Sequence, residues 1–573
     1  MATRSTVARH IIDTLHASGV RRVYGLPGDS LNAVTDAIRE VDGVDWTVTR
    51  HEEAAAFAAS AEAALTGELT VCAGSCGPGN LHLINGLFDA QRSGVPVLAL
   101  AAHIPSDEIG SGYFQETHPQ ELFRECSVYS EHITSAEQAP RLLRIAMRTA
   151  IEKRGVAVLV LPGDVALEEV TAEVTAIRPA SSRVVPAEED LASAARVLNG
   201  CEDVTILAGA GCAGAHDELL QIAETLKAPI VHAMRGKEWV EHDNPYDVGM
   251  TGLLGFASGY RAMMSAETLL VLGSDLPYQQ FYPEATVIQV DIRGERIGRR
   301  TPVEVPLVGG VAETIRALLP SLRTHSDRTH LDDAVKHYAR TRRNLDDLAS
   351  PSKRTVHPQY LTRLIDEGAT DDAVFLPDVG SPVIWAARYL TMNGRRRIVG
   401  SFTHGSMANA LSQAIGAQSA SPGRQVIALA GDGGLSMLMG ELLTLVQHDL
   451  PVKVVVFNNS SYNFVEVEMK SDGFVNFGTD LTNPDFSKVA EACGLAGFRA
   501  ETSRDLPRTV KQFLAHDGPA LLDVVVERQE LTIPPTITAA QAKGFTLYSL
   551  RTVLSGRGDE LIDLARANLR QLF

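Results

Sequence analysis

Short apolar runs rich in β-branched residues alternate with amphipathic stretches along most of the chain. In the first third the clearest runs are residues 69–73, 95–102 and 157–161, and a shorter one covers 46–49. Further runs of this kind cover 204–208, 268–272, 286–290, 373–376, 426–430, 452–457 and 521–526. Runs of this length and polarity are typical of buried strands. Their alternation with helical stretches predicts an α/β fold of parallel sheets covered by helices on both faces.

Changes of composition divide the chain into parts. A segment rich in Pro, Ser and Glu over 171–190 reads as a linker, and the charged segment 327–353 reads as a connecting helix plus linker. A break at 556–559 precedes a predicted helix over 560–573, whose leucines gather on one side. We therefore expect three α/β domains and a tail: an N-terminal domain over 1–182, a central domain over 188–330, a third domain over 350–530 and a C-terminal tail over 531–573.

Composition narrows the class of protein. A length of 573 residues suggests about three or four domains, and 45% apolar residues suffice for several cores. The net charge of −18, with no basic stripe, argues against a nucleic acid partner. Six cysteines without a CxxC pair fit free thiols in a reducing cytoplasm. We recognise no secretory signal and no apolar run long enough to span a membrane.

The strongest chemical signal lies in residues 431–459. Gly431-Asp432-Gly433-Gly434 follows one predicted strand, residues 435–448 read as a helix, and Asn458-Asn459 ends the next strand. A strand, helix and strand of this length form a right-handed crossover with parallel strands, so Asp432 and Asn459 should meet at one sheet edge. Carboxylate and amide oxygens suit Mg²⁺, and free amides at a helix start suit phosphate.

Three glycine-rich or acidic segments accompany this element. Arg50-His51-Glu52-Glu53 follows a predicted strand and opens an alanine-rich helix, and residues 74–80 form a Gly-Pro-Gly loop. Residues 110–116 form a further glycine segment that ends in an aromatic residue and an amide. A GxGxxG sequence over 209–214 is weak evidence for a nucleotide site, because no acidic residue follows about 20 positions later.

Together these elements resemble the thiamine diphosphate-dependent enzymes along nearly the whole chain, and within them the flavin-containing pyruvate:quinone oxidoreductases (pyruvate oxidases). The resemblance implies a pyrimidine-binding (PYR) first domain, a central FAD domain and a diphosphate- and Mg²⁺-binding (PP) third domain. The implied ligands are thiamine diphosphate, Mg²⁺ and FAD. The diphosphate and metal residues would be Asp432, Gly433, Gly434, Asn459 and, through its carbonyl group, Ser461.

The resemblance also implies the catalytic residues. Glu52 would contact N1′ of the aminopyrimidine ring from a dry site that raises the pKa of its carboxyl group, with Glu53 its solvated neighbour. Gly405, Ser406 and Met407 would form the segment that bends the cofactor over Met407. Phe114 and Gln115 would reach the active site of a second subunit. The residues alone leave open a first-turn glutamate, a core methionine and a plain surface loop.

The flavin and substrate residues follow in the same way. FAD would lie against Thr251, Gly252, Leu253, Gly273, Ser274, Asp275, Leu276, Pro277 and Asp291. Phe464 and Glu468 match the substrate-pocket residues of pyruvate oxidases, whereas acetolactate synthases carry Gln-Trp at Val467-Glu468. The pyruvate oxidases most similar to the chain have Val-Leu-Gly at Ser461-Tyr462-Asn463. Asparagine takes left-handed angles less freely than glycine, so Asn463 could shift this loop.

The resemblance implies oxidative decarboxylation of pyruvate to acetate and CO₂, with electrons passed through FAD to ubiquinone. An acetolactate synthase-like carboligase, an oxygen-using pyruvate oxidase and a non-catalytic cofactor-binding homologue are the alternatives. The tail would bind membrane lipid by resemblance, although periodicity alone favours a helix docked on its own subunit. We expect a homo-oligomer, a tetramer by resemblance, that is cytoplasmic and peripheral on the inner face of the cell membrane.

Overall fold

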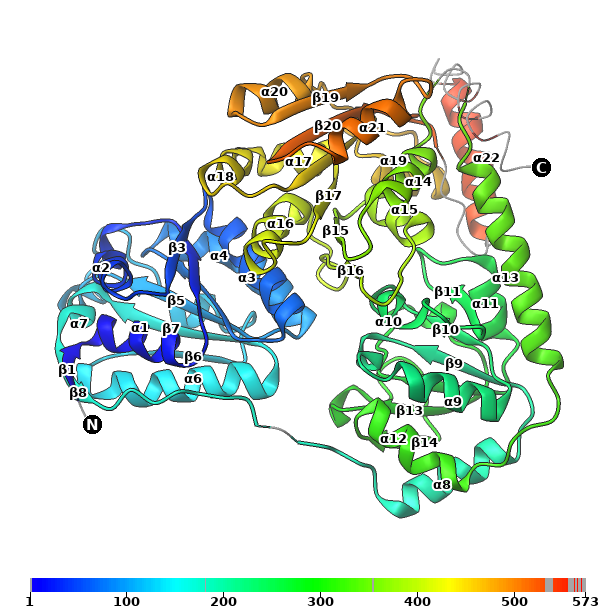
Figure 1. Cartoon of the computed structure of the whole chain (residues 1–573), viewed down its shortest axis with the longest axis horizontal. Coiled ribbons are helices and arrows are strands. Elements are labelled where there is room, and N and C mark those ends of the chain that lie inside the picture. Colours follow the sequence, from blue (N-terminus) through cyan, green and yellow to red (C-terminus); the bar gives the residue numbers. More distant parts are fainter. Residues whose placement is uncertain are drawn as a thin grey trace.

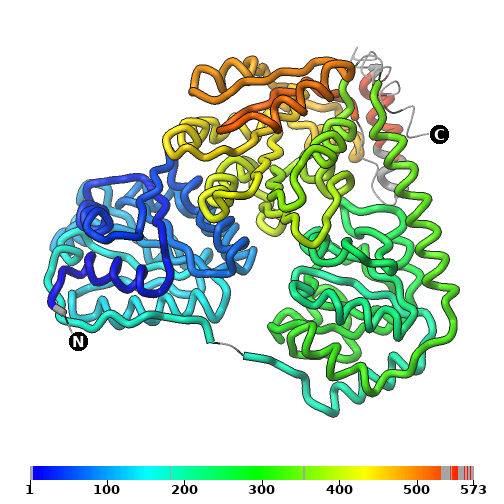
Figure 2. Tube along the Cα trace, in the orientation of Figure 1, coloured from blue at the N-terminus to red at the C-terminus, as the bar shows by residue number. Residues whose placement is uncertain are grey.

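The computed structural model describes residues 3–180, 182–352, 355–530 and 539–554, together with residues 561, 564 and 568. Three six-stranded sheets, each flanked by helices, follow one another along the chain. In Figure 1 the first part (blue to cyan) and the second (green) both lie against the third (yellow to orange). The tube in Figure 2 shows the extended segment that runs from the first part to the second. The predicted α/β fold is confirmed.

The first sheet has the strand order β3-β2-β4-β5-β7-β6, and all of its pairs are parallel. Its strands, with the antiparallel pair β1 and β8 beside it, are β1 (Thr3–Thr6), β2 (Arg22–Gly25), β3 (Asp45–Val48), β4 (Thr70–Gly74), β5 (Val97–His103), β6 (Tyr129–His132), β7 (Val156–Pro162) and β8 (Glu169–Ala172). Its helices are α1 (Val7–Ala17), α2 (Asn32–Glu40), α3 (Glu52–Thr66), α4 (Pro78–Ser93), α5 (Pro119–Leu122), α6 (Ala139–Lys153) and α7 (Gly163–Leu167). The predicted strands of this part are confirmed within two residues.

The second sheet is also parallel, with the order β11-β10-β9-β12-β13-β14. Its strands are β9 (Val204–Ala208), β10 (Ile230–His232), β11 (Asp247–Met250), β12 (Thr268–Leu272), β13 (Thr286–Asp291) and β14 (Val305–Val308). Its helices are α8 (Glu188–Asn199), α9 (His216–Leu226), α10 (Lys237–Val240), α11 (Ala257–Met264) and α12 (Val311–Leu318), and α13 (Thr329–Leu348) is the predicted connecting helix.

The third sheet has the order β16-β15-β17-β18-β20-β19, again parallel throughout. Its strands are β15 (Val374–Pro377), β16 (Arg397–Ile398), β17 (Val426–Gly431), β18 (Lys453–Asn458), β19 (Ala496–Ala500) and β20 (Ala520–Val525). Its helices are α14 (Pro358–Gly368), α15 (Ser381–Tyr389), α16 (Asn409–Ala420), α17 (Asp432–Met437), α18 (Leu442–Gln447), α19 (Asn463–Ser471), α20 (Phe486–Cys493), α21 (Leu506–Leu514) and α22 (Ala539–Leu554). Its inner strands are buried along nearly their whole length, as parallel strands covered on both faces must be.

The helix predicted over 435–448 is wrong as a single element. The structure has α17, a 3-10 turn over Met439–Glu441 and α18, and Leu438 between the first two leaves helical geometry at φ −125° and ψ 33°. The break turns Glu441 toward the first domain, where its Oε1 accepts the backbone amide of Arg50 at 3.0 Å. A long-range contact, which local periodicity does not report, thus interrupts the helix.

The first and third domains share one hydrophobic core. The alanine-rich helix α3 packs on α16, and alanines of both helices belong to a single buried cluster with residues of β4, β17 and β18. Small side chains let the two helices approach closely. This contact fixes the position of the amino terminus of α3, which carries Glu52, relative to the third sheet.

The described part of the carboxyl-terminal region docks on the third domain. Helix α22 packs against α19, and Asn568 donates its side-chain amide to the carbonyl oxygen of Gln529 at 2.6 Å. Leu561, Leu564 and Asn568 are helical, whereas the rest of the predicted break and helix over 556–573 lies outside the described residues. Among the described residues, none of the helices is both long and apolar enough to cross a membrane.

Candidate active site

The carboxylate of Asp432 lies at the carboxyl edge of the third sheet, where Gly431 of β17 is opposite Phe457 of β18. Its Oδ2 accepts the backbone amides of Asn459 at 3.1 Å and Ser460 at 2.6 Å. Burial raises the pKa of Asp432, and hydrogen bonds from a side-chain amide and three backbone amides oppose that rise. The crossover therefore brings Asp432 and Asn459 together.

The loop after β18 gathers the other predicted metal ligands. Asn459 accepts the backbone amide of Ser461 through Oδ1 at 3.0 Å, and Ser460 takes the left-handed region at φ 56°. Ser461 is buried. The Asp432 carboxylate, the Asn459 amide oxygen and the Ser461 carbonyl group are oxygen donors of the kind that Mg²⁺ prefers.

A side chain on Gly434 would have to displace Asp378. A Cβ built on Gly434 would lie 1.8 Å from Oδ2 of Asp378. Asp378 itself is buried, and burial raises its pKa to about 7 against the hydrogen bonds of four backbone amides. Its Oδ1 has no hydrogen-bond partner among the described residues. The amides of the glycine turn and this unpartnered carboxylate oxygen together suit a polar ligand at the start of α17.

The segment Gly405-Ser406-Met407 reaches toward the first domain. The Ser406 hydroxyl accepts a hydrogen bond from the side chain of Asn85 at 2.8 Å, and Met407 is half-buried. Ala408, which follows, has a left-handed φ of 66°, a strained conformation for a residue with a Cβ atom. Strain of this kind clusters at ligand sites, and the role of Met407 as a wedge stays a prediction.

Glu52 is the first residue of α3 and is buried. Its Oε2 lies 2.9 Å from Nδ1 of His82 on α4. The expectation for Glu53 is wrong: it is half-buried, and its Oε1 accepts a hydrogen bond from Asn85 at 2.7 Å. Asn85 thus joins Glu53 to Ser406, because its single amide group donates to both.

His51, Glu52 and His82 form the one cluster of potential metal-binding side chains found among the described residues. The two imidazole rings stack at 4.3 Å with 27° between their planes, and Nδ1 of His51 accepts the amide of Glu53 at 3.2 Å. Ring nitrogen lone pairs lie in the ring plane, so two nearly parallel rings do not converge on one ion. We assign no metal to this cluster.

The loop that carries Phe114 and Gln115 folds against the Gly-Pro-Gly loop. Gln115 has a left-handed φ of 63°, and its Oε1 accepts a hydrogen bond from the Cys76 thiol at 3.3 Å. Phe114 is 78% exposed. The aromatic side chain therefore points away from its own domain, as a residue that completes a neighbouring subunit would.

Helix α19 begins two residues after Ser461 and carries Phe464 and Glu468. The left-handed residue of this loop is Ser460, and Asn463 does not take the left-handed region. Asn463 accepts a hydrogen bond from the Ser381 hydroxyl and donates one to the carbonyl oxygen of Arg528, both at 2.8 Å. Its amide thus ties the start of α19 to α15 and to the chain beyond β20.

The predicted flavin residues line the carboxyl edge of the second sheet. Gly273 has a left-handed φ of 57°, and a Cβ on it would lie 2.5 Å from Cα of Gly211. The buried hydroxyl groups of Thr251 and Ser274 have no hydrogen-bond partner among the described residues. Buried hydroxyl groups normally have a hydrogen-bond partner, so two unpartnered hydroxyl groups at one edge of the sheet indicate a missing polar ligand.

The acidic residues of this edge are engaged differently. Asp275 forms an ion pair with Arg300, whose Nε lies 2.7 Å from Oδ1. Asp291 accepts the backbone amide of Arg293 at 2.8 Å, and burial raises its pKa. Of these two carboxylates, Asp291 is the one that is buried and forms no ion pair with another described residue, as a ribose-binding carboxylate requires.

The second domain meets α19 at this edge. Phe464 packs against the same hydrophobic cluster as Met250 and Leu254, and Arg388 of α15 donates to the carbonyl oxygens of Leu254 and Gly255 at 3.2 and 3.1 Å. Burial, followed by the nearby carboxylate of Glu468, raises the pKa of Tyr278. The two predicted flavin segments therefore lie beside the helix that carries Phe464 and Glu468.

Sequence comparisons place this arrangement in a known family. Models described as thiamine pyrophosphate enzyme N-terminal TPP binding domain, central domain and C-terminal TPP binding domain match residues 5–122, 191–318 and 378–524. A putative thiamine pyrophosphate-containing protein, YdaP of Bacillus subtilis, is 36% identical over 99% of each chain. The chain belongs to the thiamine pyrophosphate-dependent enzymes.

Two further relatives of this thiamine pyrophosphate enzyme have different names. Pyruvate oxidase of Lactiplantibacillus plantarum is 31% identical, covering 90% of this chain and 88% of the relative. A probable acetolactate synthase large subunit of Methanocaldococcus jannaschii is 30% identical, covering 92% and 93%. Identities this close do not separate an oxidase from a carboligase, so the choice depends on the site.

The residues fit thiamine diphosphate and Mg²⁺, and three further polar residues of the site were not predicted from the sequence. Asp378 follows a predicted strand, so the strand-end argument that found Asp432 could have found it. His82 and Asn483 carry no local signal. The Asn483 side-chain amide donates to Asp432 Oδ2 at 2.7 Å and to Asn458 Oδ1 at 2.9 Å.

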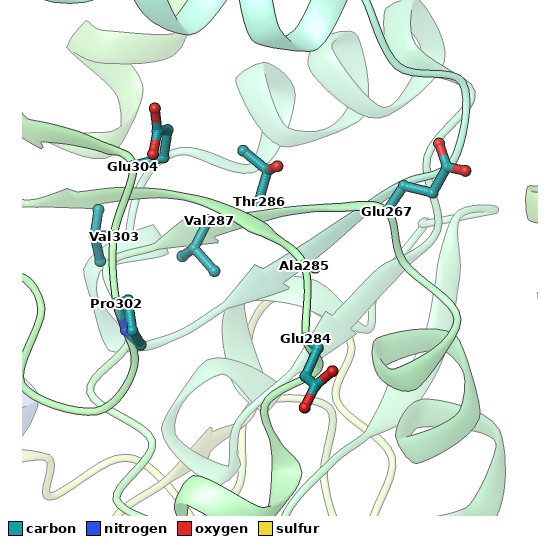
Figure 3. A pocket seen from close by; sticks show the side chains of 8 residues that line it. All are labelled: Glu267, Glu284, Ala285, Thr286, Val287, Pro302, Val303 and Glu304. Carbon is teal, nitrogen blue, oxygen red and sulfur yellow. The ribbon is translucent and has the colours of Figure 1, made fainter.

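A cavity of 680 Å³ in this thiamine pyrophosphate enzyme is lined by other residues. Its lining includes Glu267, Glu284 and Glu304, at the end of the second sheet where β12 and β13 begin. The three carboxylates point away from one another in Figure 3. The cavity therefore offers no converging donor set and is not a part of the candidate active site.

Proposed function

We propose that this thiamine pyrophosphate enzyme oxidatively decarboxylates pyruvate to acetate and CO₂ and passes two electrons through FAD to ubiquinone. The supporting observation is the proximity of α19 to the predicted flavin edge. Phe464 packs against the same hydrophobic cluster as Met250. Burial and then the Glu468 carboxylate raise the pKa of Tyr278, which lies one residue beyond the Gly273–Pro277 segment. A flavin in that place is near enough to the substrate residues to accept electrons.

The overall reaction balances with water and the quinone. Pyruvate and water give acetate and CO₂, and the two electrons and two protons released reduce the quinone to the quinol. When bound, thiamine diphosphate would supply a ring carbon that adds to the keto group and a cationic ring that delocalises the electron pair left by departing CO₂, and FAD would supply a two-electron acceptor between the substrate and the quinone.

The chain's own residues bind, orient and move protons. Asp432, Asn459 and the Ser461 carbonyl group would hold Mg²⁺, and the amides after Asp432 would hold the diphosphate. Glu52, buried at the start of α3, would hold a proton against the pyrimidine ring, with His82 fixing its carboxylate. These roles use both side chains and backbone groups, at the carboxyl edge of the third sheet and at the start of α3.

Helix α19 would decide the fate of the substrate. Phe464 offers an apolar wall and Glu468 an exposed carboxylate that can position pyruvate or move a proton. Carboligation needs room for a second 2-oxo acid, and the 30% identity to an acetolactate synthase keeps that activity as the second candidate. An oxygen-using oxidase and a non-catalytic homologue are the remaining candidates.

The proposal extends to assembly and location. Because Phe114 is 78% exposed and Gln115 folds beside the loop next to Glu52, the loop suits completion of a second subunit's site, in a homo-oligomer that we propose is a tetramer. The C-terminal tail would bind membrane lipid at the inner face of the cell membrane and otherwise leave the enzyme in the cytoplasm.

The decisive experiment is anaerobic. The protein with thiamine diphosphate, Mg²⁺ and FAD is mixed with pyruvate while the flavin absorbance is followed, and a ubiquinone analogue is added with and without anionic lipid vesicles. Bleaching followed by quinone-dependent recovery is the expected result, and faster recovery with vesicles would support the tail's role. A flavin that stays oxidised while acetolactate accumulates would overturn the proposal in favour of carboligation.

Recovery with oxygen but not with the quinone would instead indicate the oxygen-using oxidase. Complete inactivity of a protein that binds all three ligands would indicate the non-catalytic homologue. Val467→Gln/Glu468→Trp provides an internal comparison, because it installs the Gln-Trp pair of acetolactate synthases. We expect this variant to lose pyruvate-dependent bleaching of the flavin.

A further inference from the structure

Helix α19 contains a fully buried ion pair whose role the proposed reaction does not explain. Glu466 and Lys470 lie one turn apart, with Nζ 2.7 Å from Oε1, and their side chains are 0% and 1% exposed. Burying two charges is unfavourable unless their remaining hydrogen-bonding groups are also satisfied. A pair of this kind on the substrate-facing helix therefore needs a structural explanation.

Both carboxylate oxygens of Glu466 are satisfied by different parts of the chain. Oε1 accepts from Lys470, and Gln529 Nε2 lies 3.5 Å away. Oε2 accepts the Ser461 hydroxyl at 2.6 Å and a guanidinium nitrogen of Arg528 at 3.1 Å. Burial opposes ionisation, but Lys470, Ser461 and Arg528 together hold the pKa of Glu466 below its usual value. We call the Glu466 carboxylate with these four partners (Lys470, Gln529, Ser461 and Arg528) the junction.

The Ser461 side of this junction is the predicted metal loop. Tyr462 donates its amide to the carbonyl oxygen of Thr479 and Leu481 donates its amide to that of Ser460, both at 2.9 Å. Ser461 pairs with Asp480 in an isolated bridge, and Arg528 bonds both Asp480 and Glu466. Glu466 is thus the buried centre from which the loop around Ser461 is held.

The opposite side of the junction is anchored to the rigid core. Lys470 also donates to Oε1 of Gln529 at 2.7 Å, and its Nζ lies 5.5 Å from the centre of the Tyr548 ring on α22. Arg528 and Gln529 follow β20, an inner strand of the third sheet, after a gap of two residues. The carboxylate therefore connects a strand-end loop to the sheet and to the C-terminal helix.

We propose that Glu466 is a positioning residue for the Mg²⁺ site: anchored by Lys470 and Arg528, it holds Ser461 so that the Ser461 carbonyl group faces the cation. This inference rests on the proposed function only in placing Mg²⁺ beside Ser461. Glu466 is not itself a predicted metal ligand. It acts through Ser461, in the way that outer-shell partners orient metal-binding groups.

The test measures metal binding rather than turnover. Ser461→Ala, Glu466→Gln and the double variant are stripped of metal with a chelator, saturated with thiamine diphosphate and titrated with Mg²⁺ by calorimetry. Each single change is expected to raise the Mg²⁺ dissociation constant roughly tenfold. The double variant should be no weaker than Glu466→Gln, because both changes break one contact and their effects are then not additive.

A matched control separates positioning from stability. Glu241 and Lys237 form another buried ion pair four residues apart, in the second domain. Glu241→Gln should lower the melting temperature and leave Mg²⁺ affinity unchanged. In Glu466→Gln excess Mg²⁺ should restore kcat, which a merely structural defect would not allow. Unchanged Mg²⁺ affinity in Ser461→Ala, which removes only one hydroxyl group, would overturn the inference even if Glu466→Gln did not fold.

Failure of this inference is distinguishable from failure of the proposed function. Wild-type protein that binds Mg²⁺ and thiamine diphosphate but does not reduce its flavin with pyruvate would refute the reaction alone. Wild-type protein that reduces flavin, with Mg²⁺ affinity untouched in Ser461→Ala, would refute the positioning role alone.

Discussion

The side-chain amide of Asn483 donates a 2.7 Å hydrogen bond to Oδ2 of Asp432, 51 residues earlier in the chain. The same oxygen accepts the amides of Asn459 and Ser460, so three donors fix one carboxylate oxygen, and within the described part of the chain Oδ1 accepts only the adjacent amide of Gly433. The carboxylate is therefore held in one orientation before any cation binds. Preorganisation of this kind sets metal affinity.

Asn483→Ala should weaken Mg²⁺ binding roughly tenfold, because Asp432 loses an orienting partner. The measurement is a calorimetric titration of Mg²⁺ into protein saturated with thiamine diphosphate. Asn244→Ala, which removes a side-chain amide that donates to Val240 in the second domain, is the matched control and should bind Mg²⁺ normally. Equal Mg²⁺ affinities of Asn483→Ala and wild type would contradict the proposed role.

Glu52→Gln should lower turnover of pyruvate roughly a thousandfold, while thiamine diphosphate and Mg²⁺ bind nearly as in the wild type, because only proton transfer at the pyrimidine ring is lost. Flavin reduction in a stopped-flow instrument and calorimetric binding measure the two effects. Glu53→Gln is the neighbouring control and should retain most activity, since Glu53 contacts Asn85 instead. Full activity of Glu52→Gln would remove Glu52 from the mechanism.

These sites show what a single sequence can predict. The proximity of Asp432 to Asn459 follows from the parallel direction of the two strands alone, because a right-handed crossover returns both strand ends to one edge of the sheet. The contact of Asn483 with Asp432 and the partners of Asn463 could not be predicted from the sequence. Ser381 lies 82 residues before Asn463 and Arg528 lies 65 residues after it, and no local pattern marks either contact.

The broken helix after Asp432 has the same explanation. Leucine spacing over 435–448 fits a helix, yet the tertiary contact between Glu441 and the Arg50 amide overrides that periodicity. Asn463 is the converse case, since residue type alone allowed a backbone shift there. Side-chain hydrogen bonds accommodate it within a regular helical start.

The predicted flavin residues give a prediction that differs between the FAD-bound and the FAD-free protein. Thr251→Val/Ser274→Ala removes two buried hydroxyl groups that lack partners among the described residues. At about 1 kcal/mol for each hydrogen bond lost to FAD, the FAD dissociation constant should rise roughly thirtyfold. Without FAD the same variant should be as stable as the wild type or more so, because unpaired buried hydroxyl groups are destabilising.

Flavin absorbance after dialysis and thermal unfolding of the FAD-free protein measure these two quantities. Thr314→Val is the control, since its buried hydroxyl group also lacks a partner among the described residues and Thr314 is not one of the predicted flavin residues. It should retain FAD. A double variant that keeps FAD as tightly as the wild type would show that the flavin lies elsewhere.

Glu441 predicts a pH dependence of stability. Burial raises its pKa from 4.5 to about 7, opposed by hydrogen bonds from Thr444 and from the amides of Arg50 and His51. Because the pKa is higher in the folded state, folding takes up a proton between pH 4.5 and 7, so stability falls as pH rises through that window. The full loss is about 3 kcal/mol above pH 7 for a shift of this size.

Glu441→Gln should remove this loss, since the amide oxygen can still accept the Arg50 amide and carries no charge to bury. Between pH 5 and 8, the melting temperature of the apoprotein should fall more steeply with rising pH in the wild type than in Glu441→Gln. Glu491→Gln, at an exposed position of α20, should follow the wild-type profile. If Glu441→Gln keeps the wild-type slope, then the carboxyl group is not the group that titrates, and the contact between the first and third domains is insensitive to its charge.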